Sequence, residues 1–136
     1  MGKESYLVTK THQWWDPSSK RVGLTDYAQE QLGEISFVDV EGIDGATLTQ
    51  VKMDGDEPTS DPIDCVVESS KAVGDIYSPL SGTVTAIHAE LMDEPEKINE
   101  DPYGEGWLFV LNPSNLDAEK GNLLKMADYE AWVASK

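Results

Sequence analysis

Short β-prone runs separated by turn-forming residues are the feature that most constrains how this chain of 136 residues can fold. Gly, Pro, Asp and Ser interrupt the hydrophobic runs along most of the sequence. Many short strands with frequent turn signals are typical of a β sandwich or barrel. We expect strands at about 6–9, 12–15, 21–24, 35–40, 47–52, 63–68, 75–77, 82–88 and 107–111, and short helices near 25–32, 93–98 and 128–134.

The segment 25–32 carries the most complete helix signal. Thr25 can cap its first turn, Asp26 suits the positive end of the helix dipole, and Gly33 can end the helix. In the strand that follows, simple alternation places Ile35 and Phe37 on one face. These assignments predict a mainly β fold with two or three short helices.

The charge balance limits the classes of partner. The chain has 26 acidic and 10 basic residues, which gives a formal net charge of −16. Such a charge repels phosphate backbones and anionic lipid surfaces, so we expect neither a nucleic-acid nor a membrane partner. It can steer the chain toward basic surfaces, or it can be a solvated shell without meaning for partners.

Cysteine content and the N-terminal segment bear on location. One cysteine, Cys65, cannot form an internal disulfide, and residues 1–11 lack the apolar stretch of a signal peptide. No apolar run approaches the roughly 20 residues of a membrane helix. We therefore expect a cytoplasmic protein.

A lysine stands at an expected hairpin tip, which the residues Glu68, Ser69, Ser70, Lys71 and Ala72 form between two β-prone runs. A turn on a rigid sheet holds a side chain in solvent at a fixed place. A modifying enzyme can reach such a lysine, and a long cofactor attached there can swing between partners. Spacing alone, however, favours an exposed turn lysine without a role.

The surrounding sequence resembles a known family. Residues 68–82 are similar to the lipoylation segment of glycine-cleavage H proteins, which typically read Glu-Ser-Val-Lys-Ala, then Asp-Ile-Tyr, then Pro-X-Ser-Gly. Three further segments resemble the family in the correct order: 11–14, 22–33 and 99–108. Together the four segments extend over most of the chain except about 41–62.

The resemblance implies a lipoyl-domain-like barrel–sandwich hybrid of antiparallel sheets, with residues 1–136 as a single lipoyl-carrier domain. It also implies that lipoic acid forms an amide with Lys71, attached by a lipoate–protein ligase or a lipoyl transferase. Glu68, Ser69, Ser70 and Ala72 would then surround the cofactor. Such a protein is a swinging-arm carrier without activity of its own, and we expect it to be a monomer.

Some positions depart from the family pattern. The segment 42–64 is longer and more acidic than usual, Ser70 replaces a common valine, and Trp15 adds a second indole beside Trp14. These departures favour the H-protein-like lipoate-binding proteins of sulfur oxidation, which work with a heterodisulfide-reductase-like complex. The alternative is a glycine cleavage H protein, which shuttles an aminomethyl group from glycine decarboxylase to aminomethyltransferase.

Other candidate sites have simpler interpretations. Cys65 is expected to be a small buried residue, with a redox role near the arm as the alternative. His12 and His88 are the only histidines, which argues against zinc. Residues 54–57 lack the ligand spacing of a calcium loop. The tryptophans Trp14, Trp15 and Trp107 either line a groove for the arm or pack in the core.

Two other classes of function remain open at this point. No combination of a nucleophile with an acid or base supports an enzyme in its own right. A biotin carrier on a related fold usually has methionines on both sides of its lysine, whereas Ser70 and Ala72 flank Lys71.

Overall fold

The computed structural model describes residues 3–136, and antiparallel sheets dominate it. The larger sheet has seven strands in the order β12 (Leu124–Lys125), β1 (Leu7–Val8), β2 (Gln13–Trp15), β3 (Arg21–Leu24), β11 (Phe109–Pro113), β10 (Gly82–Ile87) and β5 (Thr47–Leu48). The second has three, in the order β4 (Ile35–Asp39), β8 (Val66–Ser69) and β9 (Val73–Asp75). Strands β6 (Met53–Asp54) and β7 (Glu57–Pro58) form a separate hairpin.

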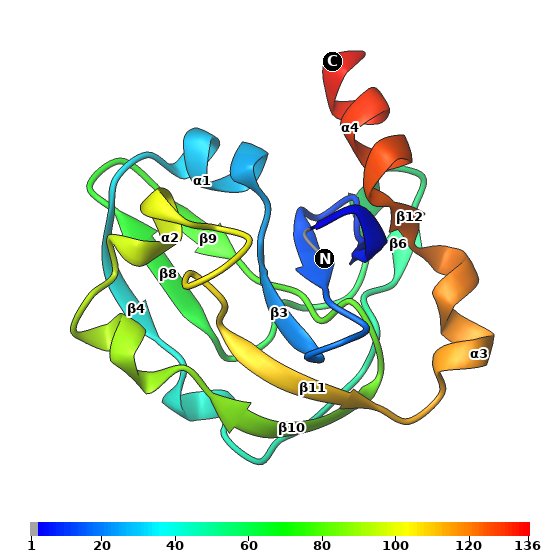
Figure 1. Ribbon diagram of the computed structural model, residues 1–136, viewed down its shortest axis with the longest axis horizontal. Coiled ribbons are helices and arrows are strands. Elements are labelled where there is room, and N and C mark those ends of the chain that lie inside the picture. The colour runs from blue at the N-terminus through cyan, green and yellow to red at the C-terminus, as the bar shows by residue number, and fades with distance from the viewer. Residues whose placement is uncertain (1–2) are drawn as a thin grey trace.

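Short helices connect the strands and lie at the edges of the molecule (Figure 1). The α-helices are α1 (Asp26–Leu32), α2 (Lys97–Glu100), α3 (Leu116–Glu119) and α4 (Met126–Ala134). The 3-10 turns are η1 (Lys3–Ser5), η2 (Glu41–Ile43), η3 (Ala89–Met92) and η4 (Lys120–Asn122). In Figure 1, α1 lies beside the β8–β9 hairpin, whereas α3, α4 and β12 lie at the opposite end of the molecule.

The main core joins the two larger sheets. Val22, Val38, Val67 and Phe109 come from β3, β4, β8 and β11 and are fully or almost fully buried in one cluster. Burial of each such side chain stabilises the fold by roughly 1.5–3 kcal/mol. The lysine hairpin therefore stands on a packed base. This arrangement confirms the mainly β prediction and its barrel–sandwich form.

Helix α1 follows its sequence signals. The hydroxyl of Thr25 accepts a hydrogen bond from the Ala28 amide at 3.2 Å, which satisfies one of the free N–H groups of the first turn. Gly33 ends the helix with φ 86°, and its amide donates to the carbonyl oxygen of Gln29 at 2.9 Å. The cap and the stop are both confirmed, and together they fix where the chain enters β4.

The expected alternation in β4 was wrong. Ile35 pairs with Ser69, whereas Phe37 pairs with Glu68, so a bulge separates the two positions. A bulge inserts one residue and turns the following side chains to the other face. Ile35 is buried, but the Phe37 side chain is 49% exposed. A second bulge in β10, between Val84 and Ala86, breaks the alternation there in the same way.

Several boundaries also differ from the prediction. Strand β8 begins at Val66 instead of residue 63, and the expected helical turn at 93–98 lies mostly between η3 and α2. The β6–β7 hairpin and α3 were not predicted. The last helix was predicted two residues short, because α4 begins at Met126.

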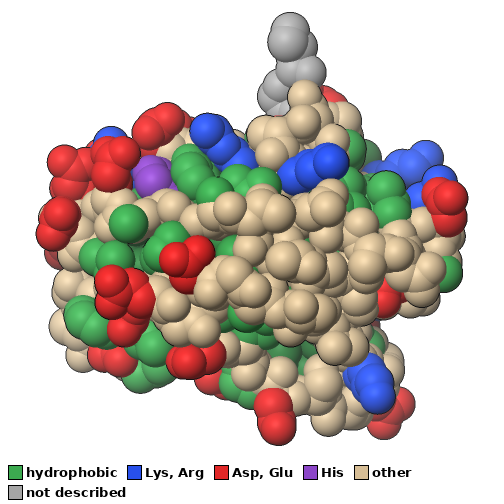
Figure 2. Space-filling model, turned by 90° about the horizontal axis from the view of Figure 1, so that it is seen from below, with side chains coloured by type: hydrophobic (Ala, Val, Ile, Leu, Met, Phe, Trp, Pro, Cys, Tyr) green, Lys and Arg blue, Asp and Glu red, His purple; other side chains and the backbone are tan. Residues whose placement is uncertain are grey.

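Acidic side chains clearly outnumber basic ones on the face seen in Figure 2, and several gather toward the end that carries β4, β8 and α2 in Figure 1. Across residues 3–136, none of the helices has the length and apolar character needed to cross a bilayer.

Candidate functional site

Lys71 lies in the turn between β8 and β9, at the tip of an antiparallel hairpin. The register Glu68 to Val73 closes the hairpin, and the Lys71 side chain is exposed. The structure brings the five predicted site residues together in this one hairpin: Glu68, Ser69, Ser70, Lys71 and Ala72.

Ser69 builds the turn. Its amide donates to the Ala72 carbonyl oxygen at 2.9 Å, and its hydroxyl accepts hydrogen bonds from the amides of Lys71 at 3.3 Å and Ala72 at 3.2 Å. The same hydroxyl donates to the carbonyl oxygen of Leu32, the last residue of α1, at 2.5 Å. One side chain thus holds the tip in shape and fastens it to the neighbouring helix.

Two glycines allow α1 to approach the hairpin closely. At Gly33, which has φ 86° and ψ −162°, a Cβ would lie only 2.8 Å from Cε of Lys71. The aliphatic stem of Lys71 therefore passes directly over Gly33. At Gly74 a Cβ would lie 3.1 Å from Cδ1 of Leu32, so the helix end packs against β9. The lysine stem is placed by contact, while its end group remains accessible.

Asn99 of α2 supports this corner from behind. Its Nδ2 donates to the Gly33 carbonyl oxygen at 2.9 Å and to Oε1 of Gln29 at 2.8 Å. Its Oδ1 accepts the amide hydrogen of Ile35 at 2.8 Å. One side chain therefore joins the end of α1, the glycine turn and the start of β4. Sequence reasoning missed Asn99, because nothing local marks an asparagine in a one-turn helix as a tertiary bridge.

The remaining predicted site residues differ in exposure. Glu68 and Ala72 are half-buried, whereas Ser70 is exposed next to Lys71. Glu68 pairs with Phe37 on β4 and with Val73 on β9, so the three side chains share the outward face of the small sheet.

Cys65 lies in the main core, where its side chain is only 5% exposed. Burial, with a smaller contribution from the charges of Asp39 and Asp64, raises the pKa of its thiol to about 12. A protonated, enclosed thiol is a poor nucleophile. The expectation of a buried apolar role is confirmed.

The two histidines have separate structural roles. His12 Nδ1 lies 2.8 Å from the hydroxyl of Tyr129, and burial together with Lys136 lowers the His12 pKa to about 4. His88 stacks on Trp107 with ring centroids 4.2 Å apart. Among residues 3–136 there is no cluster of His, Cys, Asp and Glu side chains arranged to hold a metal ion.

The tryptophans mostly pack in the interior. Trp14 and Trp15 are each 1% exposed, and Trp14 Nε1 donates to the carbonyl oxygens of Leu24 at 2.9 Å and Pro102 at 3.0 Å. Trp107 is half-buried under the Arg21 guanidinium. Trp14 and Trp15 are therefore core residues and do not line an open groove.

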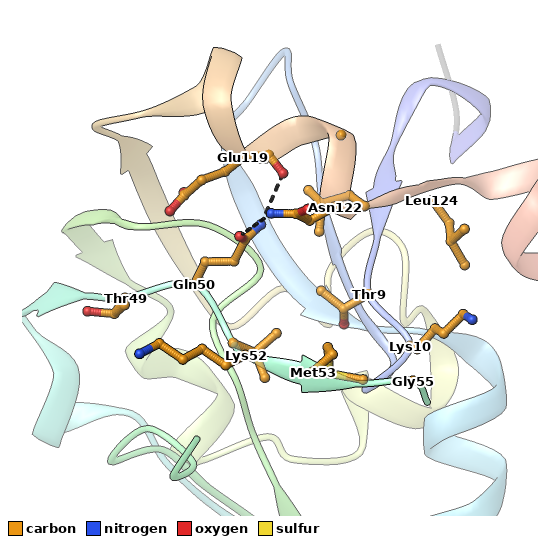
Figure 3. Close-up of a pocket in the computed structure, with 13 residues that line it drawn as sticks. Thr9, Lys10, Thr49, Gln50, Lys52, Met53, Gly55, Glu119, Asn122 and Leu124 are labelled. Atoms are coloured by element: carbon orange, nitrogen blue, oxygen red, sulfur yellow. Dashed lines mark hydrogen bonds between the residues drawn. The ribbon is translucent and has the colours of Figure 1, made fainter. Parts of the chain in front are cut away.

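A cavity of about 610 Å³ lies away from the lysine hairpin, between β6, β12 and the α3–η4 segment (Figure 3). The side-chain amide of Gln50 links one part of the cavity wall to the α3–η4 segment. Its Nε2 donates to the Glu119 carbonyl oxygen at 3.1 Å, and its Oε1 accepts from Asn122 Nδ2 at 2.9 Å. None of residues 68–72 lines this cavity. It is therefore separate from the lysine site.

The family model described as "Glycine cleavage H-protein" matches residues 6–136. The chain belongs to the glycine cleavage H-protein family. A probable glycine cleavage system H protein of Pyrococcus abyssi is 38% identical over 136 residues, covering 98% of this chain and 92% of that protein. The glycine cleavage system H protein of Geobacillus kaustophilus is 40% identical over 127 residues, covering 92% of this chain and 91% of that protein.

A solved structure shows the same fold in this family. The crystal structure of a glycine cleavage system H protein from Mycobacterium marinum superposes with a TM-score of 0.77 at 28% identity. The match covers 96% of this chain and 98% of that one.

Glycine cleavage H proteins are carriers and not catalysts, and they hold a covalently attached lipoate on a lysine. The residues of this chain fit such an attachment. Lys71 is exposed at a hairpin tip, its stem is placed over Gly33, and the turn beneath it is held by Ser69.

Proposed function

We propose that Lys71 is the lipoyl-attachment residue and that the whole chain is one carrier domain of glycine cleavage. In this role it takes the aminomethyl group from glycine decarboxylase to aminomethyltransferase. The observation that carries the proposal is an exposed lysine on a fastened hairpin, in a chain that matches the glycine cleavage H-protein family over residues 6–136.

Attachment needs only a free amine from this chain. The Nζ of Lys71, once deprotonated, displaces the activating group from an activated lipoyl carboxyl that a ligase or transferase supplies. An amide bond forms, the activating group leaves, and the lysine loses its positive charge. When bound, lipoate supplies the disulfide/dithiol chemistry of the carrier.

The residues of this chain then position the arm. Ser69 holds the hairpin against the end of α1, and Asn99 holds that helix end against the start of β4. Gly33 lets the stem of Lys71 lie close to the helix end. A long arm on a fixed base samples a limited volume, which raises its effective concentration at the active site of a docked enzyme.

The comparisons favour the glycine-cleavage alternative over the sulfur-oxidation hypothesis. The relatives described above are named for glycine cleavage, and the alignment with the Pyrococcus abyssi protein spans 98% of this chain. The acidic segment 42–64, which prompted the sulfur-oxidation hypothesis, therefore lies inside an alignment with a glycine-cleavage relative that spans almost the whole chain. The heterodisulfide-reductase-like complex has no support here as a partner.

We propose a cytoplasmic location as well. Cys65 is buried and has no second cysteine with which to form an internal disulfide, which suits a reducing compartment.

Mass spectrometry after co-expression with lipoate-attaching enzymes tests the attachment. We expect one lipoyl group on the wild-type chain and none on Lys71→Arg, which keeps the charge but removes the acylatable amine. A lipoyl group on Lys71→Arg would place the arm elsewhere. A wild-type chain that stays unmodified with both a ligase and a transferase would refute the carrier proposal.

The pathway has its own test. The lipoylated chain is incubated with glycine decarboxylase and glycine, and then with aminomethyltransferase. We expect the aminomethyl group to be accepted and passed on. Lipoylated protein that accepts no aminomethyl group would remove the glycine-cleavage role while leaving the attachment intact.

A further inference from the structure

The outer face of the small sheet carries an ordered mixture of apolar and acidic side chains beside the lysine. Pairing places Phe37, Glu68 and Val73 in one row across β4, β8 and β9. The row of Asp39, Val66 and Asp75 runs beside it. We call these six residues the outer face. In both directions apolar and acidic side chains alternate on it.

Burial confirms which way these rows point. The intervening row consists of Val38, Val67 and Gly74, and its two valines are 2% and 0% exposed in the core. Phe37 is 49% exposed and Val73 is 65% exposed. They are the two large hydrophobic side chains of residues 3–136 that stand out as exposed.

Local structure places Phe37 outward. The bulge in β4 shifts the register between Ile35 and Phe37, so Ile35 enters the core while Phe37 joins the outward row. A half-exposed phenylalanine forgoes part of the stabilisation that full burial would supply. Exposed apolar side chains rimmed by polar ones mark a surface that a partner can cover.

The charge of the outer face limits what can cover it. Asp39, Glu68 and Asp75 give it three carboxylates, and the chain as a whole has a net charge of −16. A second copy would bring carboxylates against carboxylates, which is repulsive. A partner with an apolar centre and surrounding Arg or Lys side chains would satisfy both features.

The position of Lys71 selects the kind of partner. An enzyme that uses a finished arm meets the end of that arm and can stand away from the hairpin. An enzyme that attaches the arm must bring Nζ of Lys71 itself into its active site. Val73 follows Lys71 by two residues on β9, and Glu68 precedes it by three on β8.

We propose that the outer face is the docking surface for the lipoate-attaching enzyme, with Phe37 and Val73 as its apolar contacts and Asp39 and Asp75 as its charged ones. The inference rests on the proposed function, since it assumes that Lys71 receives lipoate. It adds two residues of β4, Phe37 and Asp39, which are distant in sequence, to the recognition of the hairpin.

The test uses the full chain and a purified lipoate–protein ligase with lipoate and ATP. Initial rates are followed by intact mass, and binding of the unmodified chain to the ligase is measured separately by biolayer interferometry. The variants are Phe37→Ser, Val73→Ser and Asp39→Lys with Asp75→Lys. Circular dichroism and thermal unfolding check that each variant is folded.

Matched controls lie at the other end of the molecule. Met53→Ser on β6 removes a partly exposed apolar side chain, and Asp117→Lys on α3 reverses a carboxylate whose side chain is 98% exposed. We expect these controls to stay within about twofold of wild type in both binding and rate.

For the outer-face variants we expect KM and Kd to rise at least about fivefold while kcat stays within about twofold, because docking is weakened and the amine is unchanged. The charge-reversed variant should also lose most of the salt dependence of association.

Wild-type kinetics in folded outer-face variants would refute the docking surface while leaving Lys71 as the attachment residue. A wild-type chain that the ligase does not modify at all would instead count against the proposed function. Self-association that Phe37→Ser abolishes would assign the face to a second copy and overturn the proposal.

Discussion

The Ser69 side chain makes several of the hydrogen bonds that shape the lysine turn. Its hydroxyl accepts from the amides of Lys71 and Ala72 and donates to the carbonyl oxygen of Leu32. We expect Ser69→Ala to lower the free energy of unfolding by about 1–2 kcal/mol, because it leaves partly buried polar groups without a partner. Urea denaturation measures the loss.

The neighbouring Ser70→Ala is the matched control, since Ser70 is exposed in the same turn. It should change stability by less than about 0.5 kcal/mol. We also expect lipoylation of Ser69→Ala to slow more than that of Ser70→Ala, because the tip is less ordered. Equal stability of the two variants would show that the Ser69 contacts carry little energy.

Cys65 shows how burial decides whether a thiol is chemically available. The thiol is 5% exposed, and its pKa is raised to about 12. We expect negligible reaction of the native chain with Ellman's reagent near neutral pH, and one equivalent of reaction in denaturant. Rapid native labelling would indicate that the core opens around Cys65 and would revive a redox role for it.

At the scale of elements, the junction between α1 and β4 requires glycine at position 33. Its φ of 86° and ψ of −162° fall in a region that side chains disfavour by about 1–3 kcal/mol. We expect Gly33→Ala to destabilise the chain by that amount. It should also displace the stem of Lys71, because the added Cβ would lie 2.8 Å from Cε of Lys71. Thermal unfolding measures the first effect, and the nuclear magnetic resonance shifts of Lys71 report the second.

Gly121→Ala is the control for this substitution. Gly121 lies in η4, where an added Cβ meets no atom within 4 Å. Its substitution should be neutral or slightly stabilising, since alanine lowers the entropy of the unfolded chain. If both alanine variants behaved alike, the backbone at Gly33 would not be under conformational constraint.

The same junction shows what the sequence can and cannot reveal. The Thr25 cap, the Gly33 stop and the lysine turn are local signals, and all three could be predicted. The outward turn of Phe37 depends on a bulge set by pairing with β8, and the bridge from Asn99 joins segments more than 60 residues apart. Local periodicity predicts neither the outward position of Phe37 nor the Asn99 bridge, because both depend on partners distant along the chain.

His12 joins the β1–β2 turn to α4. His12 Nδ1 meets the Tyr129 hydroxyl at 2.8 Å, and that hydroxyl also meets Oγ1 of Thr25 at 2.7 Å. Burial and Lys136 lower the His12 pKa from 6.5 to about 4.

The lowered pKa makes stability depend on pH. Between about pH 6.5 and 4 the unfolded chain binds a proton at His12 while the folded chain does not, so stability is full above 6.5 and falls as the pH drops toward 4. Because His12 is only half-buried, we expect a contribution of about 1–2 kcal/mol over this window. Denaturation of wild type and His12→Asn at several pH values isolates it, since asparagine tolerates the positive φ at this position. Parallel pH profiles of the two proteins would contradict the prediction.

At the scale of the whole molecule, the net charge of −16 opposes folding, because compaction brings like charges together. The ion pairs of the chain are partly exposed; Lys3 and Glu130, for example, lie 2.6 Å apart with side chains 38% and 51% exposed. Each such pair contributes about 0–1 kcal/mol, so screening them costs little. The long-range repulsion, in contrast, involves most of the surface.

We therefore expect salt to stabilise this chain. Raising ionic strength from about 0.01 M to about 1 M shortens the Debye length from about 30 Å to about 3 Å and removes most of the repulsion between separated carboxylates. The Tm should rise by several degrees, since about 1 kcal/mol corresponds to roughly 3–6 °C for a domain of this size.

Calorimetry in sodium chloride measures the rise. A variant with Asp44→Lys and Asp93→Lys, both exposed positions, should gain less because it starts with less repulsion. A Tm that fell with salt, or rose equally in the variant, would show that local ion pairs outweigh the net charge.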